Sequence, residues 1–183
     1  MSQKPEILKR KIIAQSRIFT IEGLELRFAN GALRHYERLV GDASKNSVMI
    51  VPMLAQETVL LIREYAAGIN EYTLGLPKGV VDEGESSEQA ANRELQEEVG
   101  YAARHIEYLT TLTVSPGYLS AQMDVLVARN LYEKRLVGDE PEIIEVVPWS
   151  INHLDELLER PDFREARSIA ALFMVKQRLT KDE

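Results

Sequence analysis

The sequence predicts an α/β (α+β) fold, with strands and helices mixed along the chain. Three observations favour this class: a globular composition, apolar runs of strand length, and segments that carry helix-capping signals. The 183 residues are 45% hydrophobic and 28% charged, which is ordinary for a compact domain with a hydrophobic core. We expect one compact protein in which residues 1–45 form an N-terminal extension and residues 46–183 form the main domain.

The N-terminal extension is predicted to contain a β-hairpin over residues 18–40. Apolar residues alternate with polar ones from Leu24 to Phe28, which is the period of a half-buried strand. The dipeptide Asn30-Gly31 is typical of a type I′ turn between two antiparallel strands.

Short apolar runs predict the strands of the main domain. The expected strands cover residues 48–54, 58–62, 106–114, 123–128 and 143–148. Two segments between them are predicted to be irregular: residues 68–79, which are rich in glycine and turn residues, and the acidic loop 130–142.

The first predicted helix lies between Ser86 and Gly100. Ser86 is a favourable N-cap, and Gln89 three residues later completes a capping box. Gly100 supplies a C-terminal stop.

Two further helices are predicted near the C-terminus. One covers residues 151–159. The other begins at Asp162, with Glu165 as the third helical residue of a capping box, and runs to about Leu179 with Leu172 and Phe173 facing inward.

Composition and patterning exclude several classes of protein. The chain has no cysteine, which rules out disulfides, zinc-thiolate sites and thiol nucleophiles. We expect a cytoplasmic protein without a membrane partner, because no apolar run approaches 18 residues and no signal-peptide pattern is present. The net charge of −7 argues against a nucleic-acid partner.

The first predicted helix concentrates carboxylates on one edge. Glu94 and Glu98 are four residues apart, and Glu97 lies beside them. A solvated acidic face is the alternative, but such faces usually interleave lysine, and no lysine occurs between Gly79 and Gly100. Gathered carboxylate oxygens suit Mg²⁺, for which Mn²⁺ can substitute.

Residues 79–101 fill the fixed positions of the pattern G-x5-E-x7-R-E-U-x-E-E-x-G-U, in which U is apolar. The residues that match are Gly79, Glu85, Arg93, Glu94, Glu97, Glu98 and Gly100. The chain therefore resembles the Nudix hydrolase family, and Tyr101 departs only in standing where a small aliphatic residue is usual. The resemblance implies a mixed β-sheet in an α/β/α sandwich, with residues 46–183 as the Nudix domain.

Segments outside this box resemble the ADP-ribose pyrophosphatase branch of the family. They are Pro116, residues 61–65 and residues 75–79. Gly75 and Lys78 depart from the branch, which usually has glutamate and alanine there. Together with further segments, these features resemble the ADP compounds hydrolases within the branch.

This resemblance implies Mg²⁺-dependent hydrolysis of the diphosphate in ADP-linked compounds such as ADP-ribose, NADH and diadenosine triphosphate, with release of AMP. Two alternatives remain open: a Nudix enzyme acting on nucleoside triphosphates, and a non-catalytic Nudix sensor that binds ADP-ribose.

The resemblance also implies roles within the box. Glu94 and Glu98 are expected to be the principal metal ligands, and the backbone carbonyl of Lys78 is expected to complete the metal shell. Glu97 is either a further ligand or the partner of Arg93 in an i,i+4 ion pair.

Three other box residues are assigned to the scaffold. Glu85 lies at the helix N-terminus, where a structural role is as plausible as a catalytic one, and Gly79 and Gly100 are expected to serve the backbone.

The general base is expected on the acidic loop before the last strand. Glu140 is favoured and Glu142 is second, while the box carboxylates Glu97 and Glu94 remain further candidates for a catalytic role. A solvated acidic loop is the alternative interpretation.

Substrate contacts are expected from two parts of the chain. Arg63 is predicted to clamp a phosphate, since guanidinium pairs bidentately with it, although a salt bridge to Glu64 or Glu71 is equally compatible with the sequence. Lys78 adds a second cation.

The adenosine half of the substrate is expected to meet residues nearer the N-terminus. Tyr118, two residues after Pro116, is predicted to stack on a base. The hairpin of this branch commonly crosses to a second subunit, so Arg34, Tyr36 and Arg38 are candidate contacts within a homodimer.

Overall fold

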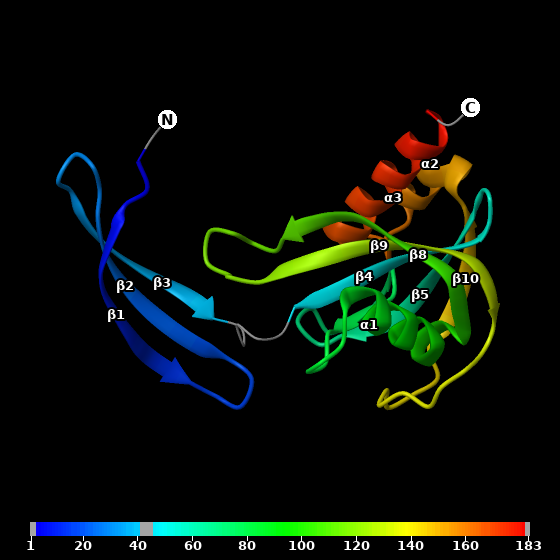
Figure 1. The fold of residues 1–183 in the computed structure, drawn as a ribbon, viewed down its shortest axis with the longest axis horizontal. Coiled ribbons are helices and arrows are strands. Elements are labelled where there is room, and N and C mark those ends of the chain that lie inside the picture. The colour runs from blue at the N-terminus through cyan, green and yellow to red at the C-terminus, as the bar shows by residue number, and fades with distance from the viewer. Residues whose placement is uncertain (1–2, 41–45, 182–183) are drawn as a thin grey trace. The chain divides into compact units, whose positions relative to one another are not determined.

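The structure is a computed structural model that describes residues 3–40 and 46–181. The chain divides into two compact units (Figure 1). The first comprises Met1–Asn46 and Thr113–Gln122, and the second comprises Ser47–Leu112 and Met123–Glu183.

The first unit contains a three-stranded antiparallel sheet in the order β1-β2-β3. Its strands are β1 (Glu6–Gln15), β2 (Thr20–Arg27) and β3 (Leu33–Val40). The predicted hairpin is confirmed as β2 and β3. Strand β1 was not predicted, because its run of Lys and Arg residues hides the apolar alternation that marks a half-buried strand.

The loop 113–122 packs beside β3 within the same unit. The backbone N–H of Leu39 donates to the carbonyl oxygen of Tyr118 at 2.7 Å, and the N–H of Ser120 donates to the carbonyl of Leu39 at 3.2 Å. This loop therefore continues the hydrogen bonding of the sheet edge.

The second unit is built on a seven-stranded mixed sheet with the path β10-β5-β4-β9-β8, to which β6 adds on β5 and β7 adds on β4. The strands are β4 (Ser47–Ala55), β5 (Thr58–Ala66), β6 (Glu71–Gly75), β7 (Lys78–Val80), β8 (Tyr101–Thr113), β9 (Gln122–Glu133) and β10 (Glu145–Ser150). The β4–β9 pairing is parallel and the β4–β5 pairing is antiparallel.

Two expectations about irregular segments are wrong. Strand β6 and the start of β7 lie within residues 68–79, where the alternation of Tyr72 and Leu74 with polar residues is too short to stand out among glycine and turn residues. Strand β9 extends to Glu133, so the acidic loop begins later than residue 130.

The helices are α1 (Ser87–Glu94), α2 (Leu154–Glu159) and α3 (Ala166–Leu179). A π-helical segment, Leu95–Val99, continues α1, and a 3-10 turn, Ile151–His153, precedes α2. Helix α1 lies on one face of the sheet, and α2 and α3 lie on the other (Figure 1). The α/β/α sandwich is thereby confirmed.

The predicted boundaries of the first helix hold. Ser86 and Gln89 form both bonds of the capping box, and Gly100 adopts the left-handed conformation at φ 82°.

The predicted start of the last helix is wrong. Its N-cap is Glu165, whose carboxylate accepts from the N–H groups of Arg167 and Ser168, while Asp162 forms ion pairs instead. Leu172 is buried as expected, but Phe173 is 43% exposed.

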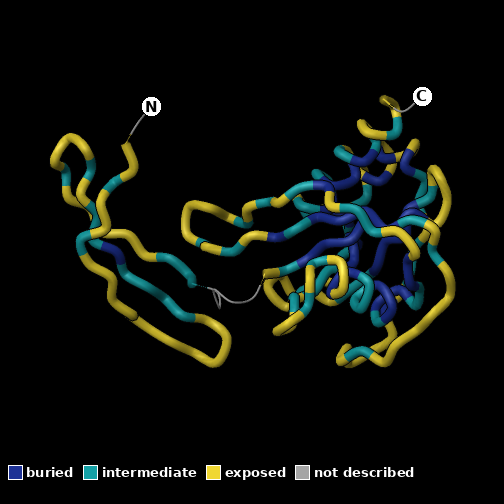
Figure 2. The backbone as a smooth tube through the Cα atoms, viewed as in Figure 1, coloured by how far each residue is buried: buried dark blue, intermediate teal, exposed yellow. Residues whose placement is uncertain are grey.

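The core is centred on strands β4 and β5 (Figure 2). Val48 and Ile50 of β4 pack with Ala91 and Leu95 of the helix in one buried cluster. Since alternate strand residues point to opposite faces, Met49 and Val51, which are also fully buried, face the side covered by α2 and α3. Helix α1 thus packs against β4 and the short strand β7 that pairs with it.

Candidate active site

The π-helical segment sets the direction of the box carboxylates. Glu94 ends α1, and Glu97 and Glu98 lie in the wider π turn, which closes with the N–H of Gly100 donating to Leu95 at 3.1 Å. Single π turns inside α-helices are frequent at functional sites.

Glu98 is a buried carboxyl group in contact with strand β7. Its side chain accepts the backbone N–H of Lys78 at 3.0 Å, and only 3% of the residue is exposed. Burial raises the pKa of Glu98 to about 8, against the opposing effect of the Lys78 charge. Burial therefore opposes ionisation of this carboxyl group unless a cation lies beside it.

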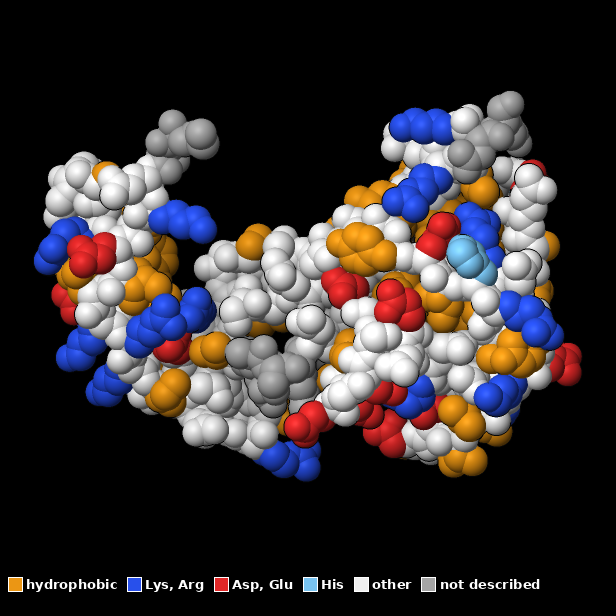
Figure 3. All heavy atoms as spheres, in the orientation of Figure 1, with side chains coloured by type: hydrophobic (Ala, Val, Ile, Leu, Met, Phe, Trp, Pro, Cys, Tyr) orange, Lys and Arg blue, Asp and Glu red, His pale blue; other side chains and the backbone are white. Residues whose placement is uncertain are grey.

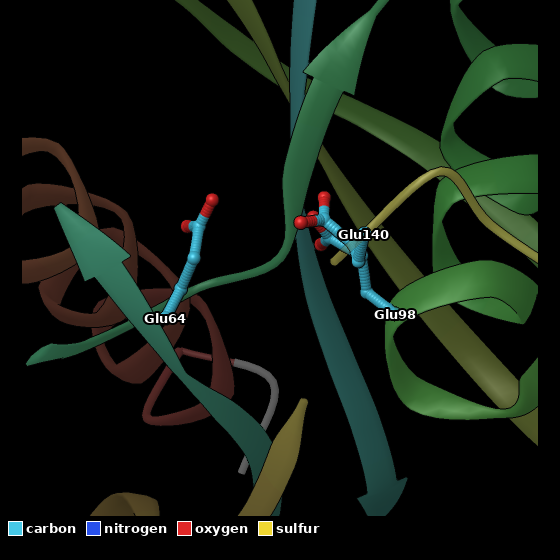
Figure 4. A group of neighbouring side chains, drawn as sticks. All are labelled: Glu64, Glu98 and Glu140. Carbon is cyan, nitrogen blue, oxygen red and sulfur yellow. The ribbon is translucent and has the colours of Figure 1, made fainter. Parts of the chain in front are cut away.

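Glu64, Glu98 and Glu140 form a carboxylate cluster. One oxygen from each lies within 4.8 Å of the other two, and the three residues come from β5, the π segment and the loop before β10 (Figure 4). Desolvation raises the pKa of Glu140, and the charges of Glu64 and Asp139 raise it further. Three convergent hard oxygens match the preference of Mg²⁺ or Mn²⁺.

Sequence reasoning missed Glu64 as a member of this site. It appeared only as a possible partner of Arg63. The available signal was the strand period: neighbouring residues of β5 point to opposite faces, so only one of the pair can face the cluster.

Gly79 is required by the position of Glu94. A Cβ atom added at Gly79 would lie 1.9 Å from Oε1 of Glu94, so no side chain fits while that carboxylate holds its place. Burial raises the pKa of Glu94, and the hydrogen bond from Arg93 opposes that effect.

Arg93 orders the carboxylates around the helix. Its guanidinium donates to Glu85 at 3.0 Å twice, to Glu94 at 2.8 Å and to Glu97 at 3.1 Å. The bond from Arg93 lowers the pKa of Glu85. The predicted Arg93–Glu97 pair is therefore confirmed, and the contacts of Glu85 fit a structural role.

A cavity of about 530 Å³ adjoins this network. It is lined by Gly79, Val80, Asp82, Arg93, Glu94, Glu97, Val137, Gly138 and Asp139. Acidic side chains gather on the surface near α1 (Figure 3). The cavity brings residues 137–139 of the acidic loop against the helix, while the assignment of the general base to this loop remains a prediction.

Glu142 contacts a tyrosine rather than the carboxylates that surround Glu140. Its carboxylate accepts the hydroxyl proton of Tyr72 at 2.7 Å, and Tyr72 packs against Tyr65 with ring centroids 5.5 Å apart. Of the two loop candidates, Glu140 is the one that joins the carboxylate cluster.

Arg63 pairs with two carboxylates that differ from those expected. Its guanidinium donates to Glu145 at 2.7 Å and also to Asp162, rather than to Glu64 or Glu71. These contacts tie β5 to β10 and to the turn before α3. The role of Arg63 as a phosphate clamp remains a prediction.

The first unit brings several predicted substrate contacts into one groove. This groove of about 230 Å³ contains Tyr36, Arg38, Pro116 and Tyr118 among its lining residues. Arg38 is paired with Glu22 at 2.7 Å, whereas the exposed Arg34 donates to the carbonyl oxygen of Leu33. Lys and Arg side chains are prominent on the surface of this unit (Figure 3).

Comparison with known proteins identifies both parts of the chain. Residues 43–173 match the NUDIX domain, which covers more than half of the sequence. The chain belongs to the Nudix hydrolase family. Residues 5–38 of this Nudix hydrolase match the NudE-type Nudix hydrolase N-terminal domain.

Relatives of this Nudix hydrolase cover nearly its whole length. The ADP compounds hydrolase NudE of Escherichia coli (strain K12) is 48% identical over 96% of this chain and 93% of its own. The ADP-ribose pyrophosphatase of Bacillus subtilis (strain 168) is 25% identical over 90% and 91%.

A crystal structure of an ADP compounds hydrolase is 46% identical and superposes with a TM-score of 0.93. It covers 100% of this chain and 97% of the other.

Nudix hydrolases generally use a divalent metal ion, and the carboxylate cluster offers suitable ligands for one. In the part of the chain that the structure describes, no helix combines the length and apolar character needed to cross a bilayer.

Proposed function

We propose that this Nudix hydrolase cleaves the diphosphate of ADP-linked compounds and releases AMP, using Mg²⁺, for which Mn²⁺ can substitute. The substrate class is supported by the relative that is 48% identical over nearly the whole chain, an ADP compounds hydrolase. The chemistry is supported above all by the convergence of Glu64, Glu98 and Glu140 beside Lys78.

We assign Glu98 and Glu94 as the principal metal ligands from the helix, and Glu64 as the source of a further oxygen from β5. Glu98 and Glu64 belong to the carboxylate cluster, whereas Glu94 is paired with Arg93 outside it. Glu97 serves mainly to hold Arg93. When bound, a divalent ion neutralises phosphate charge and lowers the pKa of a coordinated water.

Glu140 is the proposed general base. It is carried by a loop, belongs to the carboxylate cluster and has a raised pKa caused first by desolvation. A carboxylate with a raised pKa accepts a proton more readily near neutral pH. The backbone carbonyl of Lys78 remains a candidate for the metal shell.

Product analysis tests the activity. The enzyme is incubated with Mg²⁺ and ADP-ribose, NADH or diadenosine triphosphate, and AMP is quantified by chromatography. Absence of AMP from all three would refute the substrate class. Release of pyrophosphate from nucleoside triphosphates would favour the triphosphate enzyme, and calorimetric binding of ADP-ribose without turnover would favour the sensor.

A matched pair of variants tests the base. Glu140→Gln is expected to lower kcat by 10²-fold or more, of the order usual for general-base removal. Glu142→Gln removes a carboxylate of the same loop that is bonded to Tyr72, and it should retain most activity. The reverse ranking would transfer the role to Glu142.

We also infer a cytoplasmic homodimer in which the first unit contributes to substrate binding. Its strand β1 and the turn that follows expose apolar side chains that a second copy can cover, among them Ile12, Ile13 and Phe19. Sedimentation analysis tests the dimer. Tyr118→Ala, which removes an aromatic ring from the groove, should raise KM for ADP-ribose more than it lowers kcat.

A further inference from the structure

Lys78 contacts two members of the carboxylate cluster at once. Its backbone N–H donates to Glu98 at 3.0 Å, and its side-chain Nζ forms an ion pair with Glu64. All of these residues belong to the second unit, where Lys78 lies on β7 and Glu64 on β5. The ammonium group therefore lies against Glu64, while the backbone of the same residue holds Glu98.

The carboxylate cluster requires a positive charge. Oxygens of Glu64, Glu98 and Glu140 lie within 4.8 Å of one another, and carboxylates at this separation repel one another. Lys78 thus acts as the internal counter-ion of the cluster.

This counter-ion lies just outside the box pattern, because Lys78 immediately precedes Gly79, the first fixed residue of the box. A divalent ion that enters the cluster competes with the ammonium for Glu64, and the two cations repel each other at this range. Metal entry is therefore expected to weaken the Lys78–Glu64 pair.

We propose that Lys78 is a place-holding cation, which neutralises Glu64 in the metal-free enzyme, is displaced by the entering divalent ion, and then binds a phosphate oxygen of the substrate. The inference rests on the proposed function, because it requires the metal and the diphosphate. It predicts coupling: the metal frees the amine that the substrate needs, so each ligand favours binding of the other.

Titration of the substrate-free full-length protein with Mn²⁺, followed by electron paramagnetic resonance, tests the first step. Lys78→Met should bind Mn²⁺ about tenfold more tightly than the wild type, because no cation competes for Glu64. Lys78→Arg keeps the charge and should bind like the wild type. Lys134→Met, at an exposed lysine just after β9, controls for the change in net charge and should have no effect.

The second step of the proposal, binding of the substrate phosphate by Lys78, predicts weaker rather than tighter ligand binding when the lysine is removed. At saturating Mn²⁺, Lys78→Met should raise KM for ADP-ribose about tenfold with a smaller change in kcat, since a phosphate contact is lost. Lys78→Gln, which retains a polar side chain but no charge, should behave in the same way. This variant replaces Lys78→Met in both experiments if the methionine variant does not fold.

The outcomes separate this inference from the proposed function. Equal or weaker Mn²⁺ binding by the neutral variants would overturn the place-holding role while leaving AMP release intact. Failure of every protein to bind Mn²⁺ would overturn the metal site and this inference together.

Discussion

Replacement of Gly79 by alanine should separate activity from stability. The added Cβ would lie 1.9 Å from Oε1 of Glu94, 2.0 Å from its Cδ and 2.5 Å from Oε2. Gly79 does not have a positive φ angle, so the backbone accepts alanine. The methyl group therefore acts only by displacing the carboxylate.

The size of the effect follows from the distances. Real Cβ atoms essentially never approach a heavy atom within 3.0 Å, so the carboxylate must move by about 1 Å. A displacement of about 1 Å at a catalytic group costs about 10²-fold in rate, or about 2.7 kcal/mol of transition-state stabilisation. Because the displaced group is the end of a flexible side chain, we expect the free energy of unfolding to fall by less than about 1 kcal/mol.

The assay compares kcat/KM for AMP release from ADP-ribose with the midpoint of urea unfolding. Gly68→Ala is the matched control, since an added Cβ there meets nothing within 4 Å, and both quantities should stay near the wild-type values. A Gly79→Ala enzyme with kcat/KM within threefold of wild type would refute the argument that Glu94 has to occupy this position.

Three further variants test the electrostatics of the second unit. Arg93→Ala leaves several carboxylates without their partner and should lower the free energy of unfolding by about 3 kcal/mol; chemical denaturation measures this, and a loss below 0.5 kcal/mol would contradict it. The pKa of Glu98 is raised from 4.5 to about 8 in the folded state. In the metal-free enzyme, this group therefore lowers the free energy of unfolding as pH rises from 4.5 to 8, by up to about 5 kcal/mol in total. Glu98→Gln should remove that part of the pH dependence and nearly all activity; a wild-type unfolding profile in EDTA that parallels the variant would disprove the first claim. Asp162 has a pKa held well below its usual range, first by Arg160 and then by Arg63, so its contribution is present above pH 4 and is lost on acidification. Asp162→Asn should therefore destabilise by about 1–3 kcal/mol at pH 7, with a smaller difference from wild type at pH 2; a constant difference across this range would argue against the ion pairs.

The local features of the site were predictable because their causes are local. Ser86 and Gln89 cap α1 through bonds across three residues, and the left-handed Gly100 ends the helical run. The pairing of Arg93 with Glu97 likewise follows from helical spacing.

The remaining features depend on contacts between distant parts of the chain. The sequence predicted that Arg63 binds a phosphate. Its partners Glu145 and Asp162 lie 82 and 99 residues away in sequence, so these ion pairs could not be predicted from local patterns. Glu64 of β5 meets Glu98 and Glu140, which lie 34 or more residues later in the chain. The sequence pattern requires glycine at position 79, but the reason, the carboxylate of Glu94, becomes visible only after folding.

The π turn at Leu95–Val99 makes the number of residues between Glu94 and Gly100 a constraint in itself. A π turn holds one more residue than an α turn closed by the same backbone. Deleting Gln96 would let this stretch wind as a regular α-helix, and Glu97 and Glu98 would then point in new directions although every acidic residue was still present. Chain length at this point is therefore as restrictive as residue identity, and library designs for this enzyme should vary side chains here while keeping the spacing fixed.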